Sequence, residues 1–259
     1  MRESKIQKQK RQIIVEMDGE MVPLVNTIDD KGDKRKTRQC LWSELRLGTA
    51  KQIDDVDWKY AVSFGSSNEL GDRMKSLLEA EFDWQGEMKL YGIGDGAKWI
   101  VEQLERIAGS QYWYVIDLYH LCEYLAGAVS AWTTEGKKVV RLLKEQLKLC
   151  GIQGVLQELK KQAQGATKHE GLRKCIQYIE NRPGQFKYKE ALTHNLPVGS
   201  GKIESSHRHV IQSRLKKAGA WWKRENAAAM AELRVLRANG YWKFLWEEQN
   251  SEVLQKWAA

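Results

Sequence analysis

Residues 90–100 read LYGIGDGAKWI, and this stretch decides the fold. An apolar run over residues 88–93 ends in closely spaced glycines around Asp95, and residues 97–107 continue with the apolar spacing of a helix. Residues 112–116 (YWYVI) are β-branched and aromatic, which is typical of a strand. Strand, helix and strand in this order predict a crossover between parallel strands, and therefore an α/β protein with a mixed sheet.

Upstream of this unit the sequence predicts mainly strands. Residues 13–18 and 21–25 are apolar and β-branched, and the intervening Gly19-Glu20 predicts a hairpin with Asp18 at its turn end. The other predicted elements are a strand at residues 40–47, a helix at residues 69–82, and a solvated charged loop at residues 29–38. Residues 60–64 either extend the sheet or lead into the next helix.

Downstream, the apolar spacing is helical throughout. Residues 118–180 show helical patterns only, and Asn181-Arg182-Pro183-Gly184 ends that region. A loop at residues 196–201 precedes a second helical stretch, residues 202–257, with one break near Asn239-Gly240. The predicted organisation is an α/β core in residues 1–120, an all-helical insertion in residues 121–195, and a return helix with a helical C-terminus in residues 196–259.

The composition predicts a folded protein with an anionic partner. Hydrophobic residues make up 42% of the 259 residues, and no apolar run approaches the roughly 20 residues that a membrane span needs. The formal charge of +8 favours nucleic acid as a partner. The four cysteines are far apart and predict reduced cytosolic thiols, and the charged N-terminus lacks the apolar core of a signal peptide.

Two glycine-rich loops invite a nucleotide-binding interpretation that their spacing does not support. Gly92, Gly94 and Gly96 are spaced G-x-G-x-G and not G-x-G-x-x-G, and Asp95 would put a negative charge where a pyrophosphate has to lie. Residues 199–202 (GSGK) lack the first glycine and the final Ser or Thr of a Walker A loop.

Three acids favour metal-dependent chemistry instead. Asp18 and Asp95 each follow or end a predicted strand, and Glu204 lies in the first turn of a predicted helix. Carboxylates at strand ends of an α/β core converge on one edge of the sheet, and oxygen donors suit Mg²⁺. Each acid also has a structural alternative: Asp18-Gly19 is a common turn, Asp95 can cap the following helix, and the helix dipole favours Glu204.

Four segments, in order, resemble the DDE transposases of bacterial insertion sequences. They are VEMDGEMVPLV, LYGIGDGAKWI, YVIDLYHLCEYL and LPVGSGKIESSHRHVIQSRLKKAGAWW, and the likeness runs from about residue 13 to residue 246. It is strongest to the Kra group and more distant to mutator-type transposases. The last segment is the most specific, because Gly-Ser-Gly-x-Ile-Glu-Ser and Arg-Leu-Lys-x-x-Gly-x-x-Trp occur together at the family's spacing.

The resemblance implies an RNase H-like core with Asp18, Asp95 and Glu204 as catalytic, metal-binding acids. Two Mg²⁺ ions, for which Mn²⁺ can substitute, would clamp the attacking and leaving oxygens of an in-line phosphoryl displacement. Asp117 and His120 resemble the family's accessory Asp-x-x-His motif, and their spacing puts them on one face of a helix start. In the alternative interpretation Asp117 caps that helix and His120 packs.

The helix that follows Glu204 is strongly basic. Arg208 lies one turn after Glu204, and such side chains contribute affinity through phosphate contacts. The predicted DNA-binding residues are Arg208, Arg214, Lys216, Lys217 and Trp222. Trp221 and Trp222 could each stack on an unpaired base, although core packing is expected for at least one of them. The alternative for the charges is a solvated basic face.

The chain departs from the family at its beginning. The family carries a sizeable region ahead of the first strand that helps to recognise the element's ends, whereas Asp18 here arrives almost at once. The sequence therefore predicts the catalytic part of a longer or split protein, or a truncated copy. The resemblance implies a homo-oligomeric, cytoplasmic, nucleoid-associated protein with DNA ends and target DNA as partners. Two other classes stay open: a non-catalytic DNA-binding remnant, and an RNase H-like nuclease without strand transfer.

Overall fold

The computed structural model describes residues 12–27, 38–86, 88–165 and 169–247. The chain divides into two compact units. The first unit comprises Met1–Leu90, Glu102–Tyr112 and Gly201–Ala259, and the second comprises Tyr91–Val101 and Trp113–Ser200. The predicted charged loop at residues 29–38 lies almost wholly outside the described residues.

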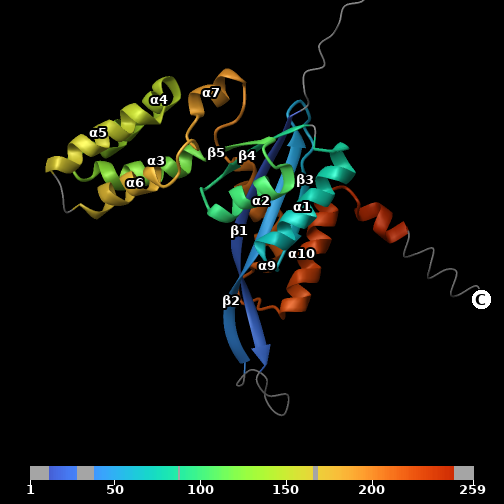
Figure 1. Ribbon diagram of the computed structural model, residues 1–259. Coiled ribbons are helices and arrows are strands. Elements are labelled where there is room, and N and C mark those ends of the chain that lie inside the picture. Colours follow the sequence, from blue (N-terminus) through green and yellow to red (C-terminus); the bar gives the residue numbers. More distant parts are fainter. Residues whose placement is uncertain (1–11, 28–37, 87, 166–168, 248–259) are drawn as a thin grey trace, which may run out of the picture. The chain divides into compact units, whose positions relative to one another are not determined.

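The protein is α/β, and its described residues contain five strands in one mixed sheet (Figure 1). The strands are β1 (Gln12–Thr27), β2 (Arg38–Gln52), β3 (Lys59–Ser63), β4 (Lys89–Gly94) and β5 (Tyr112–Ile116). Their order across the sheet is β3-β2-β1-β4-β5. β2 pairs antiparallel with both β1 and β3, while β4 and β5 are joined through a helix, the connection that parallel neighbours require. The predicted α/β class is confirmed.

The predicted hairpin at Gly19-Glu20 is wrong, and Asp18 is not at a strand end. β1 runs through these residues without a break, and Asp18 lies opposite Leu47 of β2. Pairing with the long β2 overrides the local turn preference of Asp-Gly. Gly19 has a packing role instead, because a Cβ at this position would lie 2.2 Å from Oε1 of Glu44.

The other regular elements of the described chain are helices, which loops join to one another and to the strands. They are α1 (Ser67–Phe82), α2 (Lys98–Ala108), α3 (Leu118–Val129), α4 (Gly136–Cys150), α5 (Ile152–Gly165), α6 (Glu170–Glu180), α7 (Tyr188–Thr193), α8 (Gly201–Ser206), the π-helix η1 (His207–Gln212), α9 (Ser213–Leu215) and α10 (Arg224–Ala238). The prediction of helices only after β5 is confirmed for the described residues. The nearly continuous helix predicted from residue 202 is wrong, because residues 216–223 are not helical.

A tertiary contact explains this break. Gly219 has a φ of 76°, a left-handed conformation that ends regular helix and that glycine adopts without strain. Trp222 then forms a bridge with Leu24, and its carbonyl accepts a 2.8 Å hydrogen bond from the amide of Val25. The chain therefore runs beside β1 before α10 begins.

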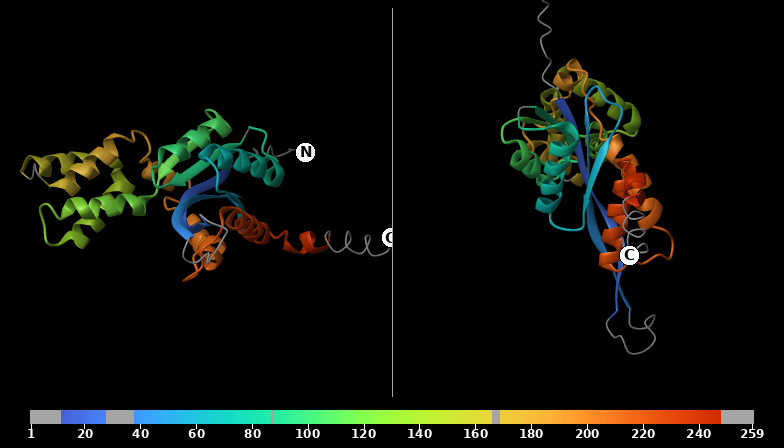
Figure 2. Two further views of the ribbon diagram at one scale, coloured as in Figure 1. Left: turned by 90° about the horizontal axis from the view of Figure 1, so that it is seen from below. Right: turned by 90° about the vertical axis from the view of Figure 1, so that its right-hand side faces the viewer.

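The return helices α8, η1, α9 and α10 cover one face of the strands in the first unit (Figure 2). Val22 and Leu24 of β1 point to this face, where they pack in one apolar cluster with Ile203, Ile211 and Leu215. Each fully buried side chain of this size stabilises the fold by about 1.5–3 kcal/mol. This cluster holds the return helices against β1, the strand that carries Asp18.

In the described part of the chain, no helix is long and apolar enough to cross a membrane. The four cysteines are free; Cys40 and Cys150 are exposed and Cys175 is buried.

Candidate functional site

Three acids occupy alternate positions in the middle of β1. Glu16, Asp18 and Glu20 point to the same face of the strand, because successive side chains of a strand alternate between its two faces. Glu16 is buried, with 2% of its surface exposed, and Asp18 and Glu20 are half-buried. This is the face that the return helices cover.

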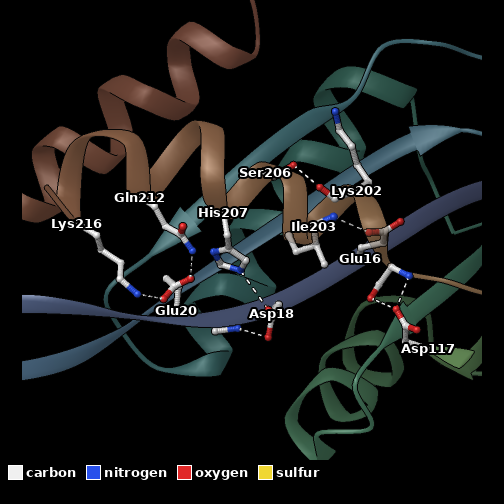
Figure 3. Close-up of polar contacts among 12 residues, drawn as sticks. Glu16, Asp18, Glu20, Asp117, Lys202, Ile203, Ser206, His207, Gln212 and Lys216 are labelled. Atoms are coloured by element: carbon white, nitrogen blue, oxygen red, sulfur yellow. Dashed lines mark hydrogen bonds and ion pairs between the residues drawn. The ribbon is translucent and has the colours of Figure 1, made fainter. Parts of the chain in front are cut away.

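Each of these acids contacts a different turn of the return helices (Figure 3). Oε2 of Glu16 accepts a 2.7 Å hydrogen bond from the amide of Ile203. Oδ2 of Asp18 lies 3.4 Å from Nε2 of His207. The Glu20 carboxylate accepts bonds from Gln212 at 2.7 Å and from Lys216 at 2.5 Å. The strand and the helices are thus joined at three successive points.

The spacing of these contacts depends on the π-helix η1. The residues of the return helices that contact the acids of β1 are Ile203, His207, Gln212 and Lys216. Successive members are four, five and four positions apart, and the interval of five lies between His207 and Gln212, within η1. A regular α-helix would bring Ile211 to the position opposite Glu20. The wider turn lets Ile211 stay fully buried in the apolar cluster while Gln212 reaches Glu20. π-Helical turns are rare and occur frequently at functional sites.

His207 is an unusual buried histidine. Only 3% of its surface is exposed, and neither ring nitrogen has a hydrogen-bond partner among the described residues. Its contact with Asp18 is close without being a hydrogen bond. Asp18 has a second contact, since its Oδ1 accepts a 2.7 Å bond from the amide of Gly19. The Asp18 carboxylate is therefore bounded on two sides and still partly exposed.

Glu204 lies in the first turn of α8, as predicted. It directly follows Ile203, whose amide is bound by Glu16, and it precedes His207 by three residues. The Glu204 side chain itself is exposed. The helical turn that carries Glu204 is thus fixed at both ends by contacts with the β1 segment that carries Asp18.

Asp95, in the second unit, follows the last residue of β4, as predicted. Its Oδ1 accepts a 2.9 Å hydrogen bond from the amide of Ala97, just before α2. This oxygen therefore caps the start of α2, which is the structural alternative given for Asp95. The next residue, Gly96, donates its amide to the Tyr114 hydroxyl at 3.0 Å. Burial raises the pKa of Tyr114, which keeps this phenol protonated.

Asp117 and His120 take the structural roles given as their alternative. Asp117 is buried and caps α3, with Oδ1 accepting from the amides of Tyr119 and His120. Its Oδ2 accepts from the amide of Ser200 at 2.6 Å and from the Ser200 hydroxyl at 2.5 Å (Figure 3). His120 packs edge-on against Tyr124 and Tyr178. Asp117 therefore holds Ser200, the residue that directly precedes α8 in the chain. An accessory chemical role for Asp117 and His120 stays a prediction.

The donor types of the three predicted acids suit Mg²⁺, which prefers carboxylate oxygens. In the described ranges, however, no group of three or more His, Cys, Asp or Glu side chains is arranged to hold a metal ion. Asp18 and Glu204 belong to the first unit and Asp95 to the second, so neither unit contains all three.

The predicted DNA-binding residues differ in their surroundings. The four cations Arg208, Arg214, Lys216 and Lys217 are exposed, and Lys216 is in addition paired with Glu20. Trp222 packs against the apolar cluster of the first unit, which is the core role expected for one of the two tryptophans. The ring of Trp221 contacts Trp42 of β2 edge-on at 6.1 Å, and 53% of Trp42 is exposed. Trp42 was absent from the predicted set.

Sequence reasoning also missed Glu16 and Glu20, and it counted His207 only as a positive charge near Glu204. The signal for the two acids was present, because Glu16, Asp18 and Glu20 alternate within VEMDGE. It was hidden by the predicted turn at Gly19, which ended the strand too early. The contact between His207 and Asp18 joins residues far apart in the sequence and has no local signature.

The chain belongs to the uncharacterised protein family UPF0236, whose model matches residues 1–250. Similar proteins occur in Caldanaerobacter subterraneus subsp. tengcongensis. UPF0236 protein TTE2489 is 29% identical over 240 residues, which cover 92% of this chain and 50% of that protein. UPF0236 protein TTE0402 is 28% identical over 240 residues, covering 92% and 46%. A third relative, 29% identical over 242 residues, covers 92% and 49% and carries a name that joins eleven designations, from TTE0033 to TTE2212. The chain spans about half the length of these curated relatives.

Proposed function

We propose that this chain is the catalytic part of a DDE-type DNA transposase with an RNase H-like core. It would cleave a DNA strand at the end of an insertion sequence and join that end to target DNA. The observation that carries the proposal is the double contact between β1 and the return helices, Glu16 with Ile203 and Asp18 with His207. These contacts hold the turn with Glu204 against the strand with Asp18, although the two acids are remote in sequence.

The fold supports the same proposal. The long first strand lies at the centre of the order β3-β2-β1-β4-β5, antiparallel to the second strand, and helices only follow β5 until the helix with Glu204. This arrangement is compatible with the RNase H-like core that the resemblance implies. Asp95 follows β4, the strand next to β1 in that order.

The names of the relatives add an independent argument. Eleven designations from one strain share a single protein name. We interpret them as copies of one gene at several positions in one genome. Such repetition is expected of an element that moves and copies itself, and it is unusual for an ordinary DNA-binding or nuclease gene. It favours a mobile element over an RNase H-like nuclease without strand transfer.

The proposed roles follow from the chemistry of each side chain. Asp18, Asp95 and Glu204 would hold two divalent ions, which supply charge stabilisation for the attacking and leaving oxygens of phosphoryl transfer. His207 and the Gly19 amide restrict where the Asp18 carboxylate can point. Arg208, Arg214 and Lys217 would bind phosphates of the DNA backbone, which neutralises charge without reading sequence.

One assay separates the three classes of function. The chain is incubated with labelled element ends, a target plasmid, and Mg²⁺ or Mn²⁺. A transposase gives cleaved ends and strand-transfer products, a nuclease gives cleaved ends only, and a binding protein gives neither. We expect both products, and we expect both to disappear in Asp18→Asn, Asp95→Asn and Glu204→Gln.

The control is Asp72→Asn, because Asp72 is an exposed acid of the first unit that pairs with Arg106. This variant should keep full activity. Products that persist in any of the three acid variants would contradict the proposed active site. Because the chain spans about half the length of its relatives, the assay is run in parallel with a full-length relative.

A further inference from the structure

Two side chains from the helical region of the second unit hold the backbone around Asp95. The Tyr178 hydroxyl, on α6, donates a 2.6 Å hydrogen bond to the carbonyl of Asp95. Nε of Arg182, just beyond α6, donates a 2.9 Å bond to the carbonyl of Gly96. Together with the bond from the Gly96 amide to Tyr114, three hydrogen bonds fix two consecutive peptide groups.

The fit between this loop and α6 is close. Gly96 has a φ of 87°, and a Cβ at this position would lie 2.7 Å from Nε of Arg182 and 2.8 Å from the Tyr178 hydroxyl. Any larger residue would push the loop away from both donors. The glycine that looked like part of a nucleotide-binding motif is thus needed for this approach.

The two donors are themselves held in place. The Arg182 guanidinium lies 4.0 Å from the centre of the Tyr178 ring, and the Tyr124 ring is stacked on Tyr178 at 4.0 Å with an interplanar angle of 18°. At these distances the two groups must occupy opposite faces of the Tyr178 ring. Arg182 also donates to the carbonyl of Tyr178 at 3.2 Å. The cation–π contact of Arg182 and the stacking of Tyr124 therefore restrict the Tyr178 and Arg182 side chains to one arrangement.

We propose that Tyr178 and Arg182 are positioning residues for the Asp95 carboxylate. The inference rests on the proposed function, and it gives the helical region after β5 a part in the chemistry. With its peptide groups fixed and Oδ1 bound to the Ala97 amide, Asp95 presents its second oxygen in a set direction. Catalytic groups must be held within about 0.5 Å of their productive geometry, and such support commonly comes from surrounding hydrogen bonds.

The test uses substitutions that remove the hydrogen bonds to the loop. Tyr178→Phe keeps the stacked ring and loses only the hydroxyl. Arg182→Lys keeps the charge but loses the guanidinium, and with it both the Nε bond to Gly96 and the bond to the Tyr178 carbonyl. The matched controls are Tyr124→Phe, in the same stack, and Arg173→Lys, on the exposed side of α6. Single-turnover DNA cleavage is measured at saturating DNA, together with the Kd for DNA and the exchange rate of the Gly96 and Ala97 amides.

We expect Tyr178→Phe and Arg182→Lys each to slow cleavage at least tenfold, with Kd within twofold of the wild type and amide exchange at least tenfold faster. The controls should match the wild type. Faster exchange without slower cleavage would overturn the positioning role, and so would unchanged exchange. Amide exchange requires no activity. A wild-type protein that cleaves no DNA would therefore refute the proposed function, while the exchange rates would still decide whether these residues hold the loop.

Discussion

The amide of Ile203 donates a 2.7 Å hydrogen bond to the buried Glu16 carboxylate, 187 residues earlier in the chain. The bond crosses from the middle of β1 to the first turn of α8. It satisfies one of the amides that the start of every helix leaves without an intrahelical partner. Glu16 thereby sets the position of α8 on the strand, and with it the position of the neighbouring Glu204.

Removal of the Glu16 carboxylate should destabilise the first unit. Glu16→Ala leaves the Ile203 amide buried without its acceptor, and we expect a loss of about 1–3 kcal/mol in the free energy of unfolding. Urea denaturation measures this loss. Glu204→Gln, on the same helical turn, should change stability by less than about 0.5 kcal/mol because its side chain is exposed. Equal losses in both variants would show that α8 is not anchored through Glu16.

His207 should be dispensable for stability and important for activity. Its two ring nitrogens are buried without hydrogen-bond partners in the described part of the chain, so His207→Phe removes a desolvated polar group at similar size. We expect unfolding free energy to stay within about 1 kcal/mol of the wild type or to rise. DNA cleavage should fall, because Asp18 loses the group that bounds its Oδ2.

The control for this substitution is His209→Phe, at an exposed position two residues away. It should leave both stability and cleavage unchanged. A large loss of stability in His207→Phe would instead mean that the imidazole nitrogens are satisfied in solution.

Cys175 should make stability fall at alkaline pH. Burial raises the pKa of this thiol from 9.0 to about 12 in the folded protein. Between these two values the unfolded chain releases the thiol proton and the folded chain keeps it, so stability falls as pH rises. The slope from this residue approaches about 1.4 kcal/mol per pH unit.

Urea denaturation between pH 9 and 11 measures this slope. The curve for Cys175→Ala should be flatter than that of the wild type by this amount, whatever its absolute stability. Cys150→Ala, which changes an exposed thiol, should follow the wild-type slope. Parallel curves for all three proteins would contradict a raised pKa at Cys175.

The exposed cations of the return helices should bind DNA in a salt-dependent manner. Arg208→Ala, Arg214→Ala and Lys217→Ala should each weaken binding, and each should reduce the slope of log Kd against log salt by about 0.9 for every phosphate that is no longer neutralised. Titration of labelled duplex at several salt concentrations measures both effects. Lys137→Ala, an exposed cation of α4, is the control and should leave the slope unchanged. If the return helices do not contact DNA, all four variants should show the same dependence of Kd on salt as the wild type.

Local patterns predicted much of the fold. The stretch YWYVI forms β5 over the predicted residues, and Asp95 and Asp117 follow β4 and β5 as expected. These segments are short, apolar and bounded by glycine or a helix cap, so neighbouring residues decide their conformation. Asp95, Asp117 and Glu204 could be placed in the same way, because each follows a strand or lies in the first turn of a helix. Asp18 could not, because it lies inside β1 and not at the turn that the local pattern predicted.

The errors arose where distant residues decide the structure. Gly19 reads as a turn, but β2 pairs with β1 on both sides of it and the Glu44 side chain covers it. The return helix looks continuous until the bridge between Trp222 and Leu24 is known. The five-residue interval before Gln212 likewise depends on the acids of β1, which no local pattern near Gln212 contains.

The anchoring of α8 through Ile203 has a consequence for Glu204. Taking a carboxylate out of water costs several kcal/mol. An acidic side chain that is held in place by burial incurs this cost. Here the buried acid is Glu16, two positions from Asp18 along β1. The hydrogen bond that its carboxylate accepts from the Ile203 amide offsets the cost of its burial. Glu204 can then be immobile at its backbone while its oxygens keep their hydration shell, free to exchange water for an incoming ligand.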